Sequence, residues 1–259
     1  MATVADILKY METIAPRSMK MDWDNVGLLC GSRNATVTKL LVALDPFEHV
    51  CQEAADWGAE LIVTHHPLIF QAMKSITDET SIGRGIMTLC RNGISAINAH
   101  TNLDQAPGGV NDVLAQALEL EGIQIIDPMG DPAYGLLRCG TTTVNDLQDF
   151  LAHVKEKLGC NGLRYVDGGK AVKKVAVGGG ACGGELVDAF YAGCDTFVTA
   201  DVKYNQFWDA KDLGLNLIDA GHFHTENPVI AVIAKKIAAT FPEIEVKISE
   251  THGECMKFY

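Results

Sequence analysis

Short runs of β-branched residues alternate with stretches whose apolar residues recur at helical spacing, and this alternation constrains the fold more than any other feature. Such runs form buried strands, and such stretches form amphipathic helices. Strands that alternate with helices favour a mainly parallel sheet, because each helix returns the chain to the start of the next strand. Strands are expected at 40–44, 61–64, 94–98, 136–143, 172–177, 196–199, 215–219 and 245–249, and helices at 48–57, 82–91, 110–120, 147–158, 185–191, 204–213 and 229–240.

The second half of the chain repeats the order of the first. Residues 58–64 (GAELIVT) resemble 193–199 (GCDTFVT), and residues 93–99 (GISAINA) resemble 214–220 (GLNLIDA). A duplicated half-domain explains both matches, and chance likeness between short glycine–strand units is the alternative. We therefore expect an α/β fold with two pseudo-duplicated domains and mainly parallel sheets.

The chain has 259 residues, which suits one large or two modest domains. Two prolines and a glycine within 127–132 make that segment the best linker candidate. We expect a first domain at 1–127, completed by the C-terminal helix and strand within 226–259, and a second domain at 128–225.

Composition excludes several classes of protein. The net charge of −12 would repel a polyanion such as DNA, and the sequence has no basic patch to offset it. No apolar run approaches the roughly 18 residues of a membrane span, and the N-terminus lacks the basic start and uninterrupted apolar stretch of a signal peptide. We expect a cytoplasmic protein whose eight scattered cysteines are core residues or free thiols.

Candidate ligands begin after the strand 61–64, where the chain continues as His65, His66 and Pro67. Adjacent residues on a strand point to opposite faces, so two neighbouring histidines do not easily bind one ion. Just past the strand end, both rings could turn into a cleft and bind two different ions. The alternative is a pair of loop histidines that are satisfied by hydrogen bonds.

A second cluster follows the strand 94–98, where His100 precedes Asp104 by four residues. Asp104 offers a hard oxygen ligand, and His100 could bind a metal or carry protons beside it. The alternative is that Asp104 caps a turn before Pro107 and Gly108.

The third cluster follows the strand 215–219. Thr225 is a good helix N-cap, and Pro228 suits the first turn of a helix. His222 and Glu226 are four residues apart and can face the same side of that turn. The alternative for Glu226 is a purely electrostatic role at the helix N-terminus.

Together the clusters offer three histidines and two carboxylates at equivalent edges of parallel sheets, where ligands usually bind. Such nitrogen and oxygen donors suit two divalent cations, with one carboxylate between them to lower their repulsion. We predict a dinuclear metal site in the cleft between the domains, with Zn, Fe, Mn and Co all open. Its predicted ligands are His65, His66, Asp104, His222 and Glu226.

Residues 178–183 (GGGACG) also fit the glycine pattern of a dinucleotide-binding loop, and Asp195 or Asp201 follows at a suitable spacing. That motif normally belongs to the first strand–helix unit, however, and here it comes after residue 170. We favour the alternative of a glycine-rich turn at a helix N-terminus, open to contact with an anion.

At these clusters the sequence resembles the Nif-three-like (YbgI-like) family of dinuclear-metal proteins, whose members are often named GTP cyclohydrolase type-two homologues. The resemblance covers nearly the whole chain. Four ordered motifs carry it: 23–29 (WDNVGLL), 64–70 (THHPLIF), 98–104 (NAHTNLD) and 219–226 (DAGHFHTE).

The resemblance implies two interlinked α/β domains and a ring-shaped homohexamer. It also implies metal ligands at the five residues named above, with Glu226 shared between the ions and His100 close to them. One segment departs from the family pattern: residues 199–205 (TADVKYN) have Ala200 in place of glycine, and Asn205 where histidine is expected. This departure puts the role of that segment in doubt, Asp201 included, but not the five ligands.

Two hypotheses about function follow. The first is a metal-dependent hydrolase acting on a nucleotide such as GTP, in which a metal activates water and His100 or His224 shuttles protons. The alternative for His224 is an exposed loop histidine. The second hypothesis is a non-enzymatic metal carrier, metal-delivery factor or regulatory scaffold. The sequence does not distinguish the two, because both need open coordination positions.

Overall fold

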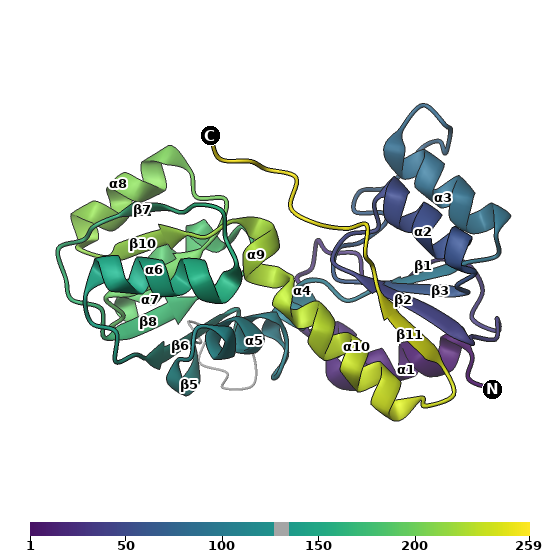
Figure 1. Cartoon of the computed structure of the whole chain (residues 1–259), viewed down its shortest axis with the longest axis horizontal. Helices are drawn as coiled ribbons and strands as arrows, with labels where there is room; N and C mark the ends of the chain where they lie inside the picture. Colours follow the sequence, from purple (N-terminus) through teal and green to yellow (C-terminus); the bar gives the residue numbers. More distant parts are fainter. Residues whose placement is uncertain (127–134) are drawn as a thin grey trace. The chain divides into compact units, whose positions relative to one another are not determined.

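The computed structural model describes residues 1–126 and 135–259, so the linker expected at 127–132 lies outside the described residues. The described part of the chain is an α/β protein with two sheets, one of five strands and one of six (Figure 1). Its residues form two compact units. These are Met1–Ala106 with Ile230–Gly253, and Pro107–Val229 with Glu254–Tyr259.

The first unit is built on the five-stranded sheet. In chain order its strands are β1 (Gly27–Cys30), β2 (Lys39–Ala43), β3 (Leu61–Thr64), β4 (Ser95–Asn98) and β11 (Glu245–Ile248). β3 lies at the centre and pairs in parallel with β2 and β4. β11 extends the parallel array beside β2, and β1 closes the other edge antiparallel to β4. This sheet is mainly parallel, as predicted.

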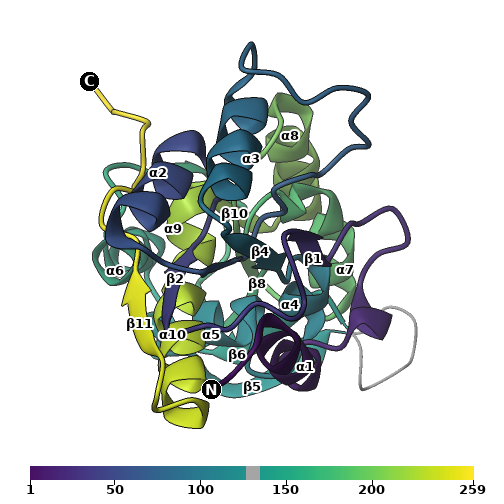
Figure 2. The same ribbon diagram turned by 90° about the vertical axis from the view of Figure 1, so that its right-hand side faces the viewer.

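Helices cover both faces of this sheet (Figures 1 and 2). α2 (Glu48–Trp57) and α3 (Ser81–Arg91) lie on one face. α1 (Val4–Ile14) and the part of α10 (Pro228–Thr240) that belongs to this unit lie on the other. Because side chains alternate along a strand, every second strand residue faces α2 and α3 and joins one core cluster with them.

The second unit is built on the six-stranded sheet. Its strands are β5 (Glu121–Ile126), β6 (Leu137–Thr141), β7 (Arg164–Val166), β8 (Lys174–Val177), β9 (Thr196–Thr199) and β10 (Asn216–Asp219). The central strands β8, β9 and β10 are parallel. β7 pairs antiparallel with β10, β6 with β8, and β5 with β6. The prediction of parallel strands therefore holds for the centre of this sheet, and its outer strands differ because they lie outside the repeated strand–helix units.

Two core clusters lie on the two faces of this second sheet. α5 (Val110–Ala117) and α6 (Leu147–Leu158) pack on one face, and α7 (Leu186–Tyr191) and α8 (Tyr204–Leu213) pack on the other. The units thus have different bounds from the expected domains, 1–127 and 128–225. α5 and β5 belong to the second unit, since β5 pairs with β6 and α5 shares a core cluster with α6.

Both units contain the same strand–helix order. β2, α2, β3, α3 and β4 in the first correspond to β8, α7, β9, α8 and β10 in the second, and the matching strands lie in the same spatial order. A five-residue helix follows each last strand, α4 (Thr101–Gln105) after β4 and α9 (His222–Glu226) after β10. This confirms the pseudo-duplication. None of the helices in the described ranges has the length and apolar character that crossing a membrane requires.

Candidate metal centre

Three histidines gather at the carboxyl edge of the first unit's sheet. His65 and His66 directly follow β3, and His100 comes shortly after β4. The ring centroids of His65 and His66 are 4.8 Å apart, and that of His100 lies 5.3 and 5.5 Å from them. Both neighbouring rings have therefore turned toward His100, and the three form a group that could hold a metal ion.

Hydrogen bonds at Nδ1 orient the two adjacent rings. Nδ1 of His65 lies 2.9 Å from the carbonyl oxygen of Ala99, and Nδ1 of His66 lies 2.6 Å from the carboxylate of Asp45. Carbonyl and carboxylate oxygens accept hydrogen bonds, so Nδ1 carries the proton in each ring. Nε2 is then the nitrogen that can bind a cation, which is the usual arrangement of metal-ligating histidines.

Asp24 orients His100 in the same way. One carboxylate oxygen of Asp24 accepts from Nδ1 of His100 at 2.8 Å, and the other accepts from the backbone N–H and hydroxyl of Thr101 at 3.0 and 2.5 Å. Burial alone would raise the pKa of the Asp24 carboxyl, but the hydrogen bonds from His100 and Thr101 outweigh it and lower the pKa to about 2. Asp24 is ionised at neutral pH and can stabilise a positive charge on His100.

Asp45 connects His66 to the C-terminal part of the first unit. Its second oxygen accepts from Nε2 of His252 at 2.9 Å. Burial alone would raise the pKa of the Asp45 carboxyl, but the hydrogen bonds from His252 and His66 hold that pKa well below its ordinary value. An ionised Asp45 can therefore hold the His66 ring in one orientation.

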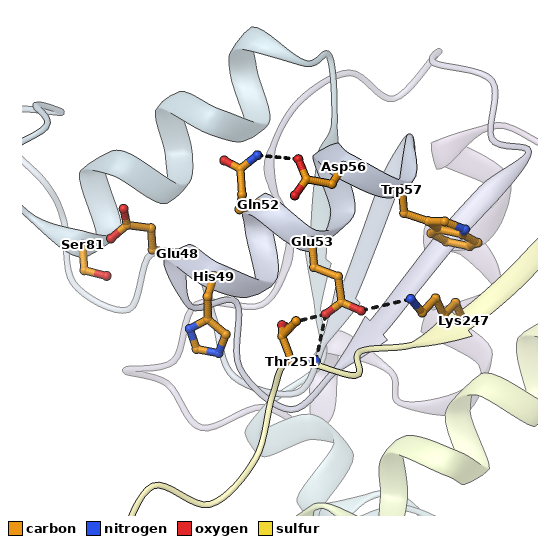
Figure 3. A pocket seen from close by; sticks show the side chains of 9 residues that line it. All are labelled: Glu48, His49, Gln52, Glu53, Asp56, Trp57, Ser81, Lys247 and Thr251. Carbon is orange, nitrogen blue, oxygen red and sulfur yellow. Dashed lines mark hydrogen bonds and ion pairs between the residues drawn. The ribbon is translucent and has the colours of Figure 1, made fainter.

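Glu53 on α2 fastens the segment that carries His252. Its carboxylate accepts from the hydroxyl of Ser249 at 2.5 Å. It also accepts from the hydroxyl of Thr251 at 2.8 Å and pairs with Lys247 at 3.3 Å (Figure 3). These contacts border a surface cavity of about 690 Å³ along α2. Because Glu53 and Lys247, which both line it, form an ion pair, we interpret this cavity as part of the contact that holds the C-terminal segment against α2.

Asp104 lies in α4 and is buried beside His65. Its Oδ1 is 3.5 Å from Nε2 of His65. Two ligands that each lie about 2.1 Å from a tetrahedral cation are about 3.4 Å apart, so this separation suits a shared ion. The side-chain amide of Asn102 fixes α4 by donating to the carbonyl of Ala15 at 2.7 Å.

In the second unit, His222 and Glu226 face each other across the first turn of α9. Nε2 of His222 is 3.0 Å from Oε2 of Glu226, whose side chain is buried. This confirms that the four-residue spacing places both on one side of the turn. Nδ1 of His222 lies 2.7 Å from the carboxylate of Asp201. The segment that departs from the family pattern therefore supplies the group that orients His222.

The glycine-rich loop closes around Glu226. Gly180 has a φ of +65°, and a Cβ built on it would clash with Oε1 of Glu226. Only glycine permits this approach. The backbone N–H of Gly180 donates to the hydroxyl of Thr225 at 3.0 Å. The prediction that Thr225 is an N-cap is wrong: Thr225 lies inside α9, which begins at His222 with Gly221 as its N-cap.

His224 has different surroundings from His222. Residues two apart in a helix point to different sides, and Nδ1 of His224 lies 3.2 Å from the carbonyl oxygen of Leu158 at the end of α6. Its ring also meets that of Phe223 edge to face, with centroids 5.6 Å apart. The ring is partly buried rather than exposed, and it fastens α9 to α6.

Sequence reasoning missed the groups that orient the candidate ligands. Asp45 and Asp201 come just after β2 and β9, so their position at the carboxyl edge of a parallel sheet was a usable signal. Asp24 lies in the motif 23–29, where its role was not predicted. The sequence gives no signal that His252 belongs to the site. The folded chain alone brings it next to Asp45.

The described residues thus include groups of histidine and acidic side chains that could hold a metal ion. Imidazole nitrogen and carboxylate oxygen are donors that Zn, Fe, Mn and Co accept. The ring of each candidate histidine ligand is held at Nδ1 by a carbonyl or a carboxylate, which fixes the orientation of the ring and its tautomer. The side chains therefore fit a metal centre.

Comparisons with known proteins extend over nearly the whole chain. A family model described as Duf34/NIF3 (NGG1p interacting factor 3) matches residues 2–254. A Clostridium perfringens protein named GTP cyclohydrolase 1 type 2 homolog is 39% identical over 235 residues, which cover 90% of each chain. A Clostridium acetobutylicum protein of the same name is 34% identical over 263 residues, which cover 98% of each. The crystal structure of a hypothetical protein of Staphylococcus aureus matches with a TM-score of 0.92 at 30% identity, over 99% of each chain.

Proposed function

The chain belongs to the Duf34/NIF3 family, and from this membership and its donor groups we propose that it is a metal-dependent hydrolase with two divalent cations. Its substrate in this proposal is a nucleotide or a related small molecule. The observation that carries the proposal is the orientation of His65, His66 and His222, whose Nδ1 atoms all meet a carbonyl or carboxylate oxygen. Histidines held in this way present Nε2 as a ligand.

Five side chains hold the cations in this proposal, with Glu226 bridging the pair. They are His65, His66, Asp104, His222 and Glu226. When bound, the cations would supply Lewis-acid polarisation of a carbonyl, imine or phosphoryl group and a water that is nucleophilic near neutral pH. The name of the two Clostridium relatives, GTP cyclohydrolase 1 type 2 homolog, makes GTP the first substrate to test.

His100 is the residue that carries a proton in this proposal. Its Nδ1 proton is held by Asp24, so Nε2 is the atom that accepts a proton from water or donates one to a leaving group. The ionised Asp24 stabilises the imidazolium that forms when Nε2 is protonated. His224 would be a second proton carrier, but its contact with Leu158 supports a structural role instead.

The test compares wild type with Glu226→Ala. Metal content is measured by elemental analysis, and turnover of GTP is followed after loading with Zn, Mn, Fe or Co. We expect metal-dependent turnover in wild type and its loss, together with lower metal content, in the variant. Equal rates in both proteins would reject the centre as catalytic.

The same proteins test the alternative of a metal carrier, metal-delivery factor or regulatory scaffold. If nucleotides and phosphoesters show no metal-dependent turnover, while the loaded protein transfers metal to an acceptor apoprotein, the alternative replaces the hydrolase. Failure to exchange metal would count against a carrier.

We also propose that the protein assembles as a homohexamer, which the family resemblance supports. Its proposed location is the cytoplasm, which the sequence supports. Native mass spectrometry of the full chain should give six times the mass of one chain. A monomer at micromolar concentration would contradict the assembly.

A further inference from the structure

Two large aromatic side chains are exposed beside the histidine cluster of the first unit. Trp23 is 63% exposed, and Phe70 is 49% exposed. Their ring centroids are 5.8 Å apart with an interplanar angle of 75°, so they meet edge to face. Removing apolar rings from water lowers the free energy of the system, and adjacent exposed rings often mark a binding surface. We propose that Trp23 and Phe70 form a stacking wall for a planar heteroaromatic ring of the ligand.

The wall lies directly against the candidate site. The ring centroid of His100 is 6.2 Å from that of Trp23 and 6.0 Å from that of Phe70. A ring that stacks on either aromatic face therefore lies next to His100, and a polar group attached to it can extend toward His65 and His66. Binding of a planar ring at the wall follows from the wall itself. That the ring belongs to a substrate rests on the proposed function.

Hydrogen bonds fix the backbone beside both rings. The side-chain amide of Asn25 donates to the carbonyl of Ile69 at 2.6 Å, which joins the two loops next to Trp23 and Phe70. The side-chain amide of Asn98, at the end of β4, donates to the carbonyl of Asn25 at 3.1 Å. The base of the wall is therefore tied to the sheet while the rings project into solvent. A fixed base reduces the ordering that ligand binding requires.

The two aromatic rings of the wall favour planar heteroaromatic ligands as a class and do not distinguish one nucleobase from another. Aromatic faces stack on any planar heteroaromatic ring, and such contacts tolerate changes in the ring's hydrogen-bonding groups. A nucleobase or another planar heteroaromatic ring fits this description. Recognition of the particular ring must then come from other groups, and the wall supplies affinity and position.

Isothermal titration of the full chain tests the wall with four probes: guanosine, adenosine and uridine triphosphates, and inorganic triphosphate, which lacks a ring. Each probe is titrated into metal-loaded and chelator-treated protein. Wild type should bind the nucleotides more tightly than inorganic triphosphate. Trp23→Ala and Phe70→Ala should each weaken nucleotide binding by about tenfold and leave triphosphate binding nearly unchanged. Trp23→Tyr, which keeps an aromatic face, should restore most of the affinity.

Trp208 provides a matched control. It is 53% exposed on α8 of the second unit, so Trp208→Ala removes a tryptophan of similar exposure elsewhere. We expect this variant to bind all four probes like wild type.

Several results would overturn the stacking wall. One is wild type that binds triphosphate as tightly as every nucleotide. Another is a Trp23→Ala variant that binds nucleotides as tightly as wild type does. A third is a Trp23→Ala variant whose affinities for nucleotides and for triphosphate fall by the same factor. A change of oligomeric state with unchanged affinity would assign the face to contacts between copies. Ring-dependent binding without metal-dependent turnover would keep the wall and reject the hydrolase.

Discussion

His66 and His252 share one carboxylate, because each ring donates to a different oxygen of Asp45, at 2.6 and 2.9 Å. The orientation of a proposed metal ligand just after β3 therefore depends on a residue that follows β11. Glu53 supports this connection by fastening the chain on the N-terminal side of His252. The relation makes metal affinity sensitive to substitutions away from the proposed ligands.

Asp45→Asn should weaken metal binding by about 10- to 100-fold, as is usual when the partner of a ligating histidine is changed. The amide has a single acceptor oxygen and cannot serve both His66 and His252. His252→Ala should cause a smaller loss, and His252→Gln should recover affinity by providing a donor. Competition against a chelating dye measures each value.

His49→Ala is the control for these variants, since its ring lies 6.2 Å from that of His252 on the same side of the unit. The metal affinity of His49→Ala should match that of wild type. Unchanged affinity in Asp45→Asn would show that His66 does not need this partner.

Gly180→Ala should lower both stability and metal affinity, because its Cβ would displace the Glu226 carboxylate. Gly193→Ala isolates the backbone effect: Gly193 has a φ of +77°, close to that of Gly180, but a Cβ there meets open space. A side chain at such a φ costs about 1 to 2 kcal/mol. Urea unfolding should show this cost in both variants and a larger one in Gly180→Ala. Equal metal affinities for the two variants would contradict the role of Gly180.

The Glu53 carboxylate should contribute stability that depends on pH. Burial alone would raise its pKa, but hydrogen bonds from Glu250, Ser249 and Thr251 outweigh it and lower the pKa to about 2. A lowered folded-state pKa gives stability that is complete above the unfolded value near 4.5 and is lost as the pH falls toward 2. Glu53→Gln should therefore cost about 2 kcal/mol at pH 7, after allowance for solvent screening, and much less near pH 2.

Urea unfolding of wild type and Glu53→Gln at several pH values measures this difference. Glu250→Gln is the control, because the Glu250 side chain is 77% exposed. Its effect should stay within about 0.5 kcal/mol at every pH. A Glu53→Gln difference that does not change between pH 7 and pH 2 would be inconsistent with the lowered pKa.

Metal removal should lower the melting temperature of wild type. A ligand at 100 times its dissociation constant stabilises the folded state by about 2.7 kcal/mol, if it does not bind the unfolded chain. Differential scanning calorimetry with excess Zn or Mn, and then with chelator, measures the shift. Glu226→Ala should show a much smaller shift, since a proposed bridging ligand is lost. Identical shifts in both proteins would argue against Glu226 as a ligand.

The repeated strand–helix units could be predicted from sequence because their strands are continuous apolar runs, such as Leu61–Thr64, and are buried on both faces. β1, β5 and β7 were missed for a physical reason. β7 has three residues, of which Arg164 and Tyr165 are exposed, and it is a strand because it pairs with β10. Local sequence carries little of that information.

The positions of the candidate ligands could be predicted because these residues follow predicted strands at the carboxyl edges of the parallel strands in the two sheets. The structure brings His65 and His66 together with His100, and it brings His222 together with Glu226. The contact between His66, Asp45 and His252 could not be predicted, since residues far apart in the chain meet there through tertiary packing alone. The joint binding of two ions by all five ligands stays a prediction.

The place of β11 in the first sheet sets an order for folding during translation. This strand is made after residues 107–229 of the second unit, yet it pairs with β2, whose edge stays open at least until the ribosome has passed residue 248. An open strand edge can pair with other chains. The nascent first unit is thus exposed to aggregation for the time needed to synthesise its neighbour, and chaperone binding to that edge would protect it.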